Sequence, residues 1–186
     1  MAVRFFVGAH TSLRAKRGKR PKGNKMKLIT PNETANSLQS IDLYKLTNKG
    51  IKLLLLDIDN TIVPRGDKEA TEEILLWLKD ARDNGLKICL MSNNTKKHFP
   101  NLEEHVDDYA IFSRKPFKTN YKRLLKKFEI DKSETVMIGD QIFTDILGAN
   151  RMGIYTILTR RQRNYGKFTR KILHWIEDKL WERYEK

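Results

Sequence analysis

The sequence contains little cysteine, no long apolar run, and acidic residues that are unevenly spread. One cysteine, Cys89, is present among 186 residues, which excludes an internal disulfide framework and favours a reducing compartment. No apolar run approaches the ~20 residues of a membrane-spanning helix. The N-terminus places a short apolar run before its basic residues, which is the reverse of a secretory signal. These absences predict a cytoplasmic protein in which Cys89, inside an apolar stretch, is a buried structural thiol.

Two segments of the chain contain no acidic residue. Residues 1–32 hold nine Lys/Arg and residues 146–176 hold seven, and the chain has a net charge of +14. Basic flanks around a nearly neutral middle favour a polyanionic partner, either an anionic membrane surface or RNA. The alternative is a solubilising tail and an ordinary basic face.

Composition divides the chain into three parts. Residues 1–27 are predicted to form a basic, disordered arm, 28–160 the folded core, and 161–186 a basic amphipathic helix. Apolar residues of this last segment fall at helical spacing, with basic residues before or beside them: Phe168, Ile172, Trp175, Ile176, Leu180 and Tyr184, with Arg160, Arg161, Arg163, Lys167, Arg170 and Lys171. This pattern is typical of a helix at a membrane interface. Packing against the sheet edge is the alternative, most of all for Ile172 and Ile176, whereas Trp181 is expected to be free to touch a bilayer or partner.

Alternating apolar segments predict the fold of the core. Leu53–Leu56 form a continuous apolar run, which indicates a strand buried on both faces of a parallel sheet. Strands are expected at 51–57, 86–91, 109–112, 135–138 and 154–158. Helices are expected at 71–85, 95–104, 117–128 and 142–151, with a short helix and connector within 31–46. This alternation predicts an α/β fold with a Rossmann-like, doubly wound parallel sheet.

Polar residues follow the ends of four predicted strands. These are Asp57-Ile58-Asp59-Asn60-Thr61, Ser92-Asn93, Lys115, and Gly139-Asp140 with Asp145. Because the carboxyl ends of parallel strands share one edge of the sheet, these side chains should converge there. Carboxylates can act as a nucleophile or hold Mg²⁺, while a hydroxyl, backbone N–H groups and a lysine can neutralise phosphoryl oxygens. The convergence predicts phosphoryl-transfer chemistry.

These segments, in this order and spacing, resemble the four motifs of the haloacid dehalogenase (HAD) phosphatases. Three longer stretches around these motifs make the chain similar to the YqeG-like branch of the capless subclass III: Met91-Ser92-Asn93-Asn94, Arg114-Lys115-Pro116 and residues 139–151. That branch is similar to mitochondrial phosphatidylglycerophosphate phosphatases. The resemblance covers roughly residues 28–175 and leaves out the basic arm.

The resemblance implies a role for each motif residue. Asp57 is the nucleophile and binds Mg²⁺; Asp59 is the general acid and base, and its backbone carbonyl is a metal ligand. Thr61 shapes the loop, while Ser92 and the Asn93 N–H bind the phosphoryl oxygens. Lys115 bridges Asp57 and the phosphate. Asp140 completes the metal site, and Asp145 orients Lys115 or a metal-bound water.

The spacing between motifs leaves no room for a cap domain. Asp59 and Ser92 are 33 positions apart, and Asn94 and Lys115 are 21 apart, which one helix and one strand between each pair nearly fill. An open site favours a large substrate, and we expect hydrolysis of phosphatidylglycerophosphate at a membrane surface, by a peripheral protein of phospholipid synthesis. The alternatives are an RNA- or ribosome-assembly-associated binding protein, which contacts phosphates through the basic arm, and a phosphatase of another phosphorylated macromolecule.

Overall fold

The computed structural model describes residues 25–64, 66–94, 99–162 and 168–184. The side chains of the last helix are described from Trp175 onward. The predicted basic arm and its proposed RNA contact therefore lie almost entirely outside the described residues. So do the basic residues Arg163 and Lys167 and the side chains of Phe168, Arg170, Lys171 and Ile172 from the predicted amphipathic stripe.

Six parallel strands form the sheet, in the order β1-β6-β5-β2-β3-β4. Their bounds are β1 Glu33–Ala35, β2 Leu53–Asp57, β3 Lys87–Met91, β4 Asp108–Ala110, β5 Thr135–Gly139 and β6 Tyr155–Thr159. Five α-helices accompany them in the described ranges: α1 Leu43–Asn48, α2 Glu72–Asp83, α3 Lys118–Phe128, α4 Leu147–Asn150 and α5 Phe168–Tyr184. Short turns of other helix types are η1 Lys25–Leu28, η2 Pro100–His105, η3 Lys132–Glu134 and the π-helix η4 Ile142–Ile146. The predicted doubly wound α/β fold is confirmed.

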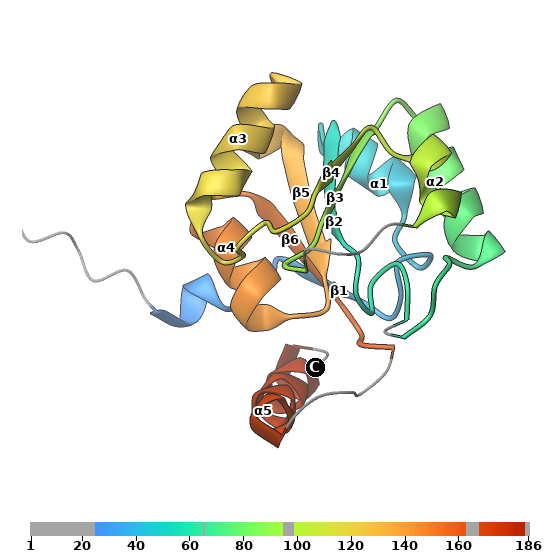
Figure 1. Ribbon diagram of the computed structural model, residues 1–186. Coiled ribbons are helices and arrows are strands. Elements are labelled where there is room, and N and C mark those ends of the chain that lie inside the picture. Colours follow the sequence, from blue (N-terminus) through green and yellow to red (C-terminus); the bar gives the residue numbers. More distant parts are fainter. Residues whose placement is uncertain (1–24, 65, 95–98, 163–167, 185–186) are drawn as a thin grey trace, which may run out of the picture.

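The central strand β2 is buried on both faces. Its four leucines are 0% exposed, and each such side chain contributes roughly 1.5–3 kcal/mol through burial. Leu54 and Leu56 pack with residues of α1 and α2, whereas Leu53 and Leu55 pack with residues of α3 and α4. Figure 1 shows these two helix pairs on opposite sides of the sheet. The unbroken apolar run is thus explained by a helical layer on each face.

Cys89 lies in β3 and is 0% exposed. Burial raises the pKa of its thiol to about 12, so the thiol stays protonated at neutral pH. The prediction of a buried structural cysteine is confirmed.

Two parts of the predicted architecture were wrong. The segment 31–46 was expected to hold only a helix and connector, but Glu33–Ala35 form β1, which pairs in parallel with β6. This strand is three residues long and lacks an apolar pattern, so its strand structure depends on the neighbouring β6. The helix expected at 95–104 is absent from its described part, where Pro100–His105 form the 3₁₀ helix η2.

The described segments between β2 and β3 and between β3 and β4 hold only loops, α2 and η2, and the absence of a cap domain is confirmed for them. Within the part of the chain that the structure describes, no helix is both long and apolar enough to cross a bilayer.

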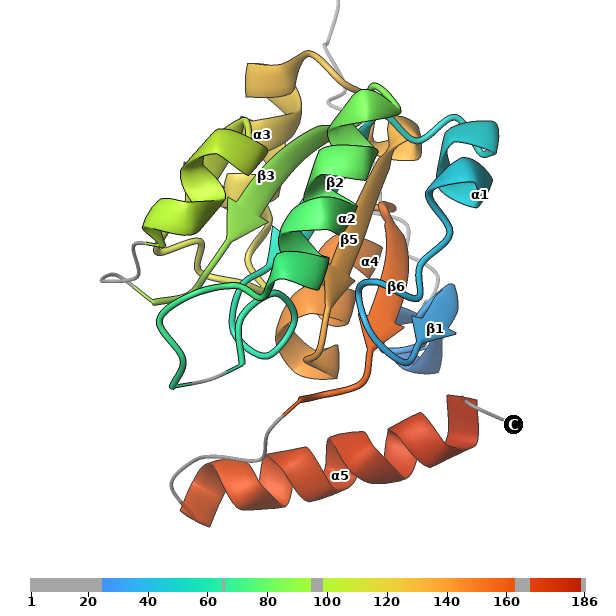
Figure 2. The same ribbon diagram turned by 90° about the vertical axis from the view of Figure 1, so that its right-hand side faces the viewer.

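Helix α5 lies apart from the two helical layers, along the side of the molecule that the carboxyl ends of β5 and β6 reach (Figure 2). Leu180, Trp181 and Tyr184 pack against Ile142, Ile146 and Leu158. The expectation that Trp181 is free for a partner is therefore wrong. Ile176, for which packing against the sheet edge was the favoured alternative, is 37% exposed, and Trp175 is 63% exposed. The docking face thus includes Leu180 and Tyr184 of the predicted stripe, together with Trp181, but leaves Trp175 and Ile176 exposed.

Candidate active site

The candidate site lies at the carboxyl end of β2, in the middle of the sheet. Strand β2 is paired with β3 on one side and with β5 on the other. This places Asp57 between Ser92, which follows β3, and Asp140, which follows β5. Asp57, Ser92 and Asp140 are all buried. The predicted convergence of strand ends is therefore observed.

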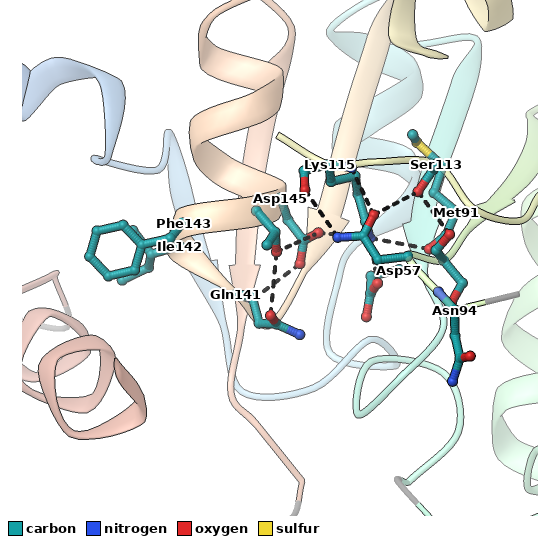
Figure 3. Close-up of polar contacts among 12 residues, drawn as sticks. Asp57, Met91, Asn94, Ser113, Lys115, Gln141, Ile142, Phe143 and Asp145 are labelled. Carbon is teal, nitrogen blue, oxygen red and sulfur yellow. Dashed lines mark hydrogen bonds and ion pairs between the residues drawn. The ribbon is translucent and has the colours of Figure 1, made fainter. Parts of the chain in front are cut away.

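Lys115 joins the two sides of the site. Its Nζ donates to an Asp57 carboxylate oxygen, to Oδ1 of Asp145 at 2.8 Å and to the carbonyl oxygen of Met91 at 3.1 Å. Figure 3 shows the lysine lying among these three residues. The side chain is 2% exposed, so its three donors are held in fixed directions, with one on the candidate nucleophile.

Asn93 fixes the backbone of Lys115. Its side-chain Oδ1 accepts from the Lys115 N–H at 2.7 Å, and its Nδ2 donates to the Lys115 carbonyl at 3.0 Å. Its side chain is thus a clamp for the lysine, a role that the sequence did not indicate. The Asn93 N–H was the group predicted to bind phosphoryl oxygens.

Ser113 lies in the site but was not predicted to belong to it. Its buried hydroxyl donates to the Ser92 carbonyl at 2.9 Å and approaches Asn93 Oδ1 at 3.3 Å. The hydroxyl of Ser92, the predicted phosphoryl contact, accepts from the Asn94 N–H at 3.0 Å. Ser113 lies two residues before Lys115, and both side chains are directed inward. This spacing is the feature that could have marked Ser113 as a residue of the site.

A tight loop after β2 presents Asp59 and Thr61. The Ile58 carbonyl accepts from the N–H groups of Ile62 and Val63, and the Asn60 N–H donates to the Val63 carbonyl at 2.8 Å. Asn60 has a φ of 65°, a conformation that asparagine tolerates better than most residues. Thr61 is buried within this loop, and its role in shaping the loop stays a prediction.

Asp145 is held as a partner of Lys115. Its Oδ1 accepts from Lys115 and from the Thr144 hydroxyl, and its Oδ2 accepts from the Gln141 N–H at 3.1 Å. A Cβ at Gly139 would lie 2.3 Å from that Oδ2, so only glycine fits there. Of the two roles predicted for Asp145, these contacts favour orientation of the lysine.

The site carries more negative than positive charge. Burial raises the pKa of Asp57 and Lys115 opposes this rise, while the neighbouring carboxylates of Asp145 and Asp140 raise it further. Burial, with the charge of Asp145, raises the pKa of Asp140 to about 6 against the opposing effect of Arg161. For Lys115 burial acts in the other direction, but the carboxylates of Asp145 and Asp57 outweigh it and raise its pKa. The lysine is therefore always protonated, but its charge does not fully neutralise the carboxylates around it.

These carboxylates fit a divalent cation. Oxygen atoms of Asp57, Asp140 and Asp145 lie within 4.8 Å of one another. Asp57 Oδ2 and Asp140 Oδ1 are buried and have no hydrogen-bond partner within the described ranges. Buried carboxylate oxygens without partners are costly, and Mg²⁺ prefers such ligands. Asp57 and Asp140, with the Asp59 carbonyl, would hold the ion.

Two further residues of the site were missed. Arg161, predicted to belong to a basic face, is 6% exposed, and its Nε donates to Asp140 Oδ2 at 3.1 Å. Its Nη2 donates to Glu177 Oε2 at 2.5 Å. Burial raises the pKa of Glu177 to about 7 although Arg161 opposes the rise. The sequence offered one indication for Glu177: it is the first acidic residue after the acid-free segment 146–176.

Comparison with known proteins agrees with this geometry. The model of the HAD-hydrolase-like family matches residues 112–174. The chain is 32% identical over 133 residues to the probable phosphatase YqeG of Bacillus subtilis, covering 71% of this chain and 77% of that protein. It is 28% identical over 148 residues to phosphatidylglycerophosphate phosphatase 1, chloroplastic/mitochondrial, of Arabidopsis thaliana, covering 70% of this chain but 40% of the relative.

A solved structure shares the fold. A haloacid dehalogenase-like hydrolase from Brucella suis superposes with a TM-score of 0.53 at 13% identity, over 68% of this chain and 93% of that one. Three observations support the same family: the order of the motifs, the buried carboxylates around Lys115, and the extent of the match to YqeG. The chain belongs to the YqeG-like HAD phosphatases.

Proposed function

We propose that this phosphatase is Mg²⁺-dependent and hydrolyses phosphatidylglycerophosphate presented at a bilayer surface. The observation that carries this proposal is the segment that contains Lys115. Ser113 and Lys115 are buried in the site, whereas Ile111, Phe112 and Phe117 are 46%, 48% and 62% exposed. One short segment therefore supplies the catalytic lysine inward and apolar side chains outward.

Basic residues accompany the exposed apolar side chains. The Arg114 guanidinium lies 4.7 Å from the centre of the Phe112 ring, and Arg114 and Lys118 are both exposed. Exposed aromatic residues beside cations match the interface of an anionic bilayer, where rings enter the headgroup layer and cations meet lipid phosphates. The absence of a cap in the described segments leaves the site open to such a surface. The similarity to the phosphatidylglycerophosphate phosphatase of Arabidopsis supports the same substrate.

The residues provide a complete hydrolytic cycle. An Asp57 oxygen attacks phosphorus, the bond to the leaving oxygen breaks, and Asp59 donates a proton to that oxygen. Water then attacks the aspartyl-phosphate, Asp59 takes the proton, and inorganic phosphate leaves with the Asp57 carboxylate restored. Lys115, Ser92 and the Asn93 N–H neutralise phosphoryl oxygens, and a bound Mg²⁺ would supply further charge neutralisation.

The test compares two substrates with two proteins. Phosphate release is measured from phosphatidylglycerophosphate in phosphatidylglycerol vesicles and from soluble glycerol 3-phosphate, with the wild type and Phe112→Ser/Phe117→Ser. We expect the ratio of vesicle to soluble turnover to fall at least about tenfold in the variant, because burial of each ring in the interface contributes about 1.5–3 kcal/mol. A wild type that prefers the soluble substrate, or an unchanged ratio in the variant, would contradict the lipid substrate.

A further inference from the structure

Helix α5 is joined to the candidate metal site by a buried carboxylate. Glu177 is 3% exposed, and its Oε1 accepts from the Ile142 N–H at 3.0 Å and approaches the Phe143 N–H at 3.5 Å. Ile142 and Phe143, shown in Figure 3, directly follow the turn that contains Asp140 and Gln141. Glu177 therefore holds the backbone that begins η4, two residues beyond a predicted metal ligand.

The other oxygen of Glu177 reaches that ligand through Arg161. The Arg161 guanidinium donates to Glu177 Oε2 at 2.5 Å, to Asp140 Oδ2 at 3.1 Å and to Asp178 Oδ1 at 3.3 Å. Asp140 Oδ2 is thus occupied, while Asp140 Oδ1 is buried and without a partner in the described residues. This arrangement orients the aspartate so that one defined oxygen remains for a cation.

We propose that Glu177 is a positioning residue for the metal site, and that it acts by holding Arg161. The guanidinium must meet two requirements. It fixes the orientation of Asp140, yet its positive charge opposes a cation bound to the same carboxylate. Glu177 offsets that charge and holds the guanidinium at its observed distance from Asp140. Such partners of a metal ligand commonly change metal affinity 10–100-fold when they are altered.

The docking of α5 does not depend on this carboxylate alone. Leu180, Trp181 and Tyr184 pack against Ile142, Ile146 and Leu158, so apolar contacts hold the helix in place as well. Glutamine at position 177 can still accept from the Ile142 N–H, but it cannot neutralise Arg161. Glu177→Gln therefore separates the charge from the structural role of the side chain.

The experiment measures Mg²⁺ binding directly, by isothermal titration calorimetry of the full chain at pH 8. We expect Glu177→Gln to raise the Mg²⁺ Kd at least about tenfold. The matched control is Glu182→Gln on the same helix, because Glu182 is exposed and pairs with Lys179; its Kd should equal that of the wild type. An unchanged Kd in Glu177→Gln, or an equal change in Glu182→Gln, would overturn the proposal.

Two further variants keep the test decisive. Arg161→Gln added to Glu177→Gln should recover part of the lost affinity, because it removes the charge beside Asp140 that Glu177 no longer offsets; an additive loss contradicts the charge argument. Should Glu177→Gln melt at a much lower temperature, Arg161→Lys leaves the contacts of Glu177 with η4 in place but cannot form the fork between two carboxylates. A weaker Mg²⁺ Kd in that variant supports the proposal, and an unchanged Kd overturns it.

Discussion

The carboxylate of Glu33 and the carboxylates of the candidate site have opposite electrostatic surroundings. At the edge of the sheet, Glu33 of β1 accepts from the Tyr155 hydroxyl at 2.6 Å and pairs with Lys45 and Lys49 at 3.0 and 3.1 Å. Burial opposes its ionisation, but these hydrogen bonds outweigh burial and lower its pKa to about 2. In the candidate site, the pKa values of Asp57 and Asp140 are raised instead.

The difference comes from the ratio of cations to acids. Two lysines and a phenol surround one carboxylate at the edge, so ionised Glu33 stabilises the attachment of β1 to the sheet. In the site, Asp57 and Asp145 share Lys115, while Asp140 and Glu177 share Arg161. The excess negative charge costs folding free energy and favours cation binding. One cluster therefore serves stability, whereas the other retains an unfavourable charge for function.

The largest expected effect is loss of activity in Asp57→Asn. Removal of the proposed nucleophile should lower kcat by about four orders of magnitude or more, while the substitution relieves charge repulsion and leaves the fold intact. Phosphate release and thermal melting, measured on the same preparation, check both statements. Asp67→Asn, at an exposed aspartate beyond the same loop, is the control and should retain activity. Wild-type turnover in Asp57→Asn would remove Asp57 from the mechanism.

Asp140→Asn should stabilise the metal-free protein, whereas most substitutions of buried residues destabilise. Because the folded-state pKa of Asp140 is about 6, ionisation destabilises the folded protein once the pH rises above ~4, and this penalty is complete above about pH 6. Without metal, the variant should be more stable than the wild type by about 1–3 kcal/mol at pH 8. The two proteins should be equally stable at pH 4. Chemical denaturation with urea at both pH values gives the comparison, and a less stable variant at pH 8 would contradict it.

Mg²⁺ should stabilise the wild type and have little effect on Asp140→Asn. At a concentration of 100 times its Kd, a bound ion contributes about 2.7 kcal/mol, or about 5–10 °C in melting temperature for a chain of this length. Removal of the ion with EDTA should return the melting temperature to the metal-free value. An equal response of the variant to Mg²⁺ would place the ion elsewhere.

Glu33→Gln should have a smaller effect of the opposite sign. The pKa of Glu33 is lowered to about 2, so its contribution is present above about pH 4.5 and is lost as the pH falls towards 2. After allowance for the solvent exposure of this cluster, the variant should lose about 1 kcal/mol at pH 7. Urea denaturation at pH 7 and pH 2.5 tests this, and an equal loss at both values would show that charge is not the cause.

The smallest effect is expected at an exposed ion pair. Lys79 and Asp83 lie one turn apart in α2, with a separation of 2.6 Å, and both side chains are about 60% exposed. Lys79→Met should leave the melting temperature unchanged, because solvent and salt screen such pairs. A marked decrease would show that ion pairs outside the two carboxylate clusters also contribute to stability.

The sequence determined the core of the fold and most of the candidate site. The apolar run Leu53–Leu56 specified a strand buried on both faces, and polar residues after four strands specified one catalytic edge. These features follow from local patterns and from the rule that parallel strands end together. Asp57, Lys115, Asp140 and Asp145 were predicted and are brought together.

Only the tertiary structure decided the remaining features, because each depends on contacts between distant segments. Strand β1 exists through its pairing with β6, and Asn93 clamps the backbone of a lysine 22 residues away. The same is true of Arg161 and Glu177. By sequence, one belongs to a basic stretch and the other to a surface helix, but the path of the chain after β6 buries both beside Asp140. A local pattern records neither that path nor the partner that a charge meets at its end.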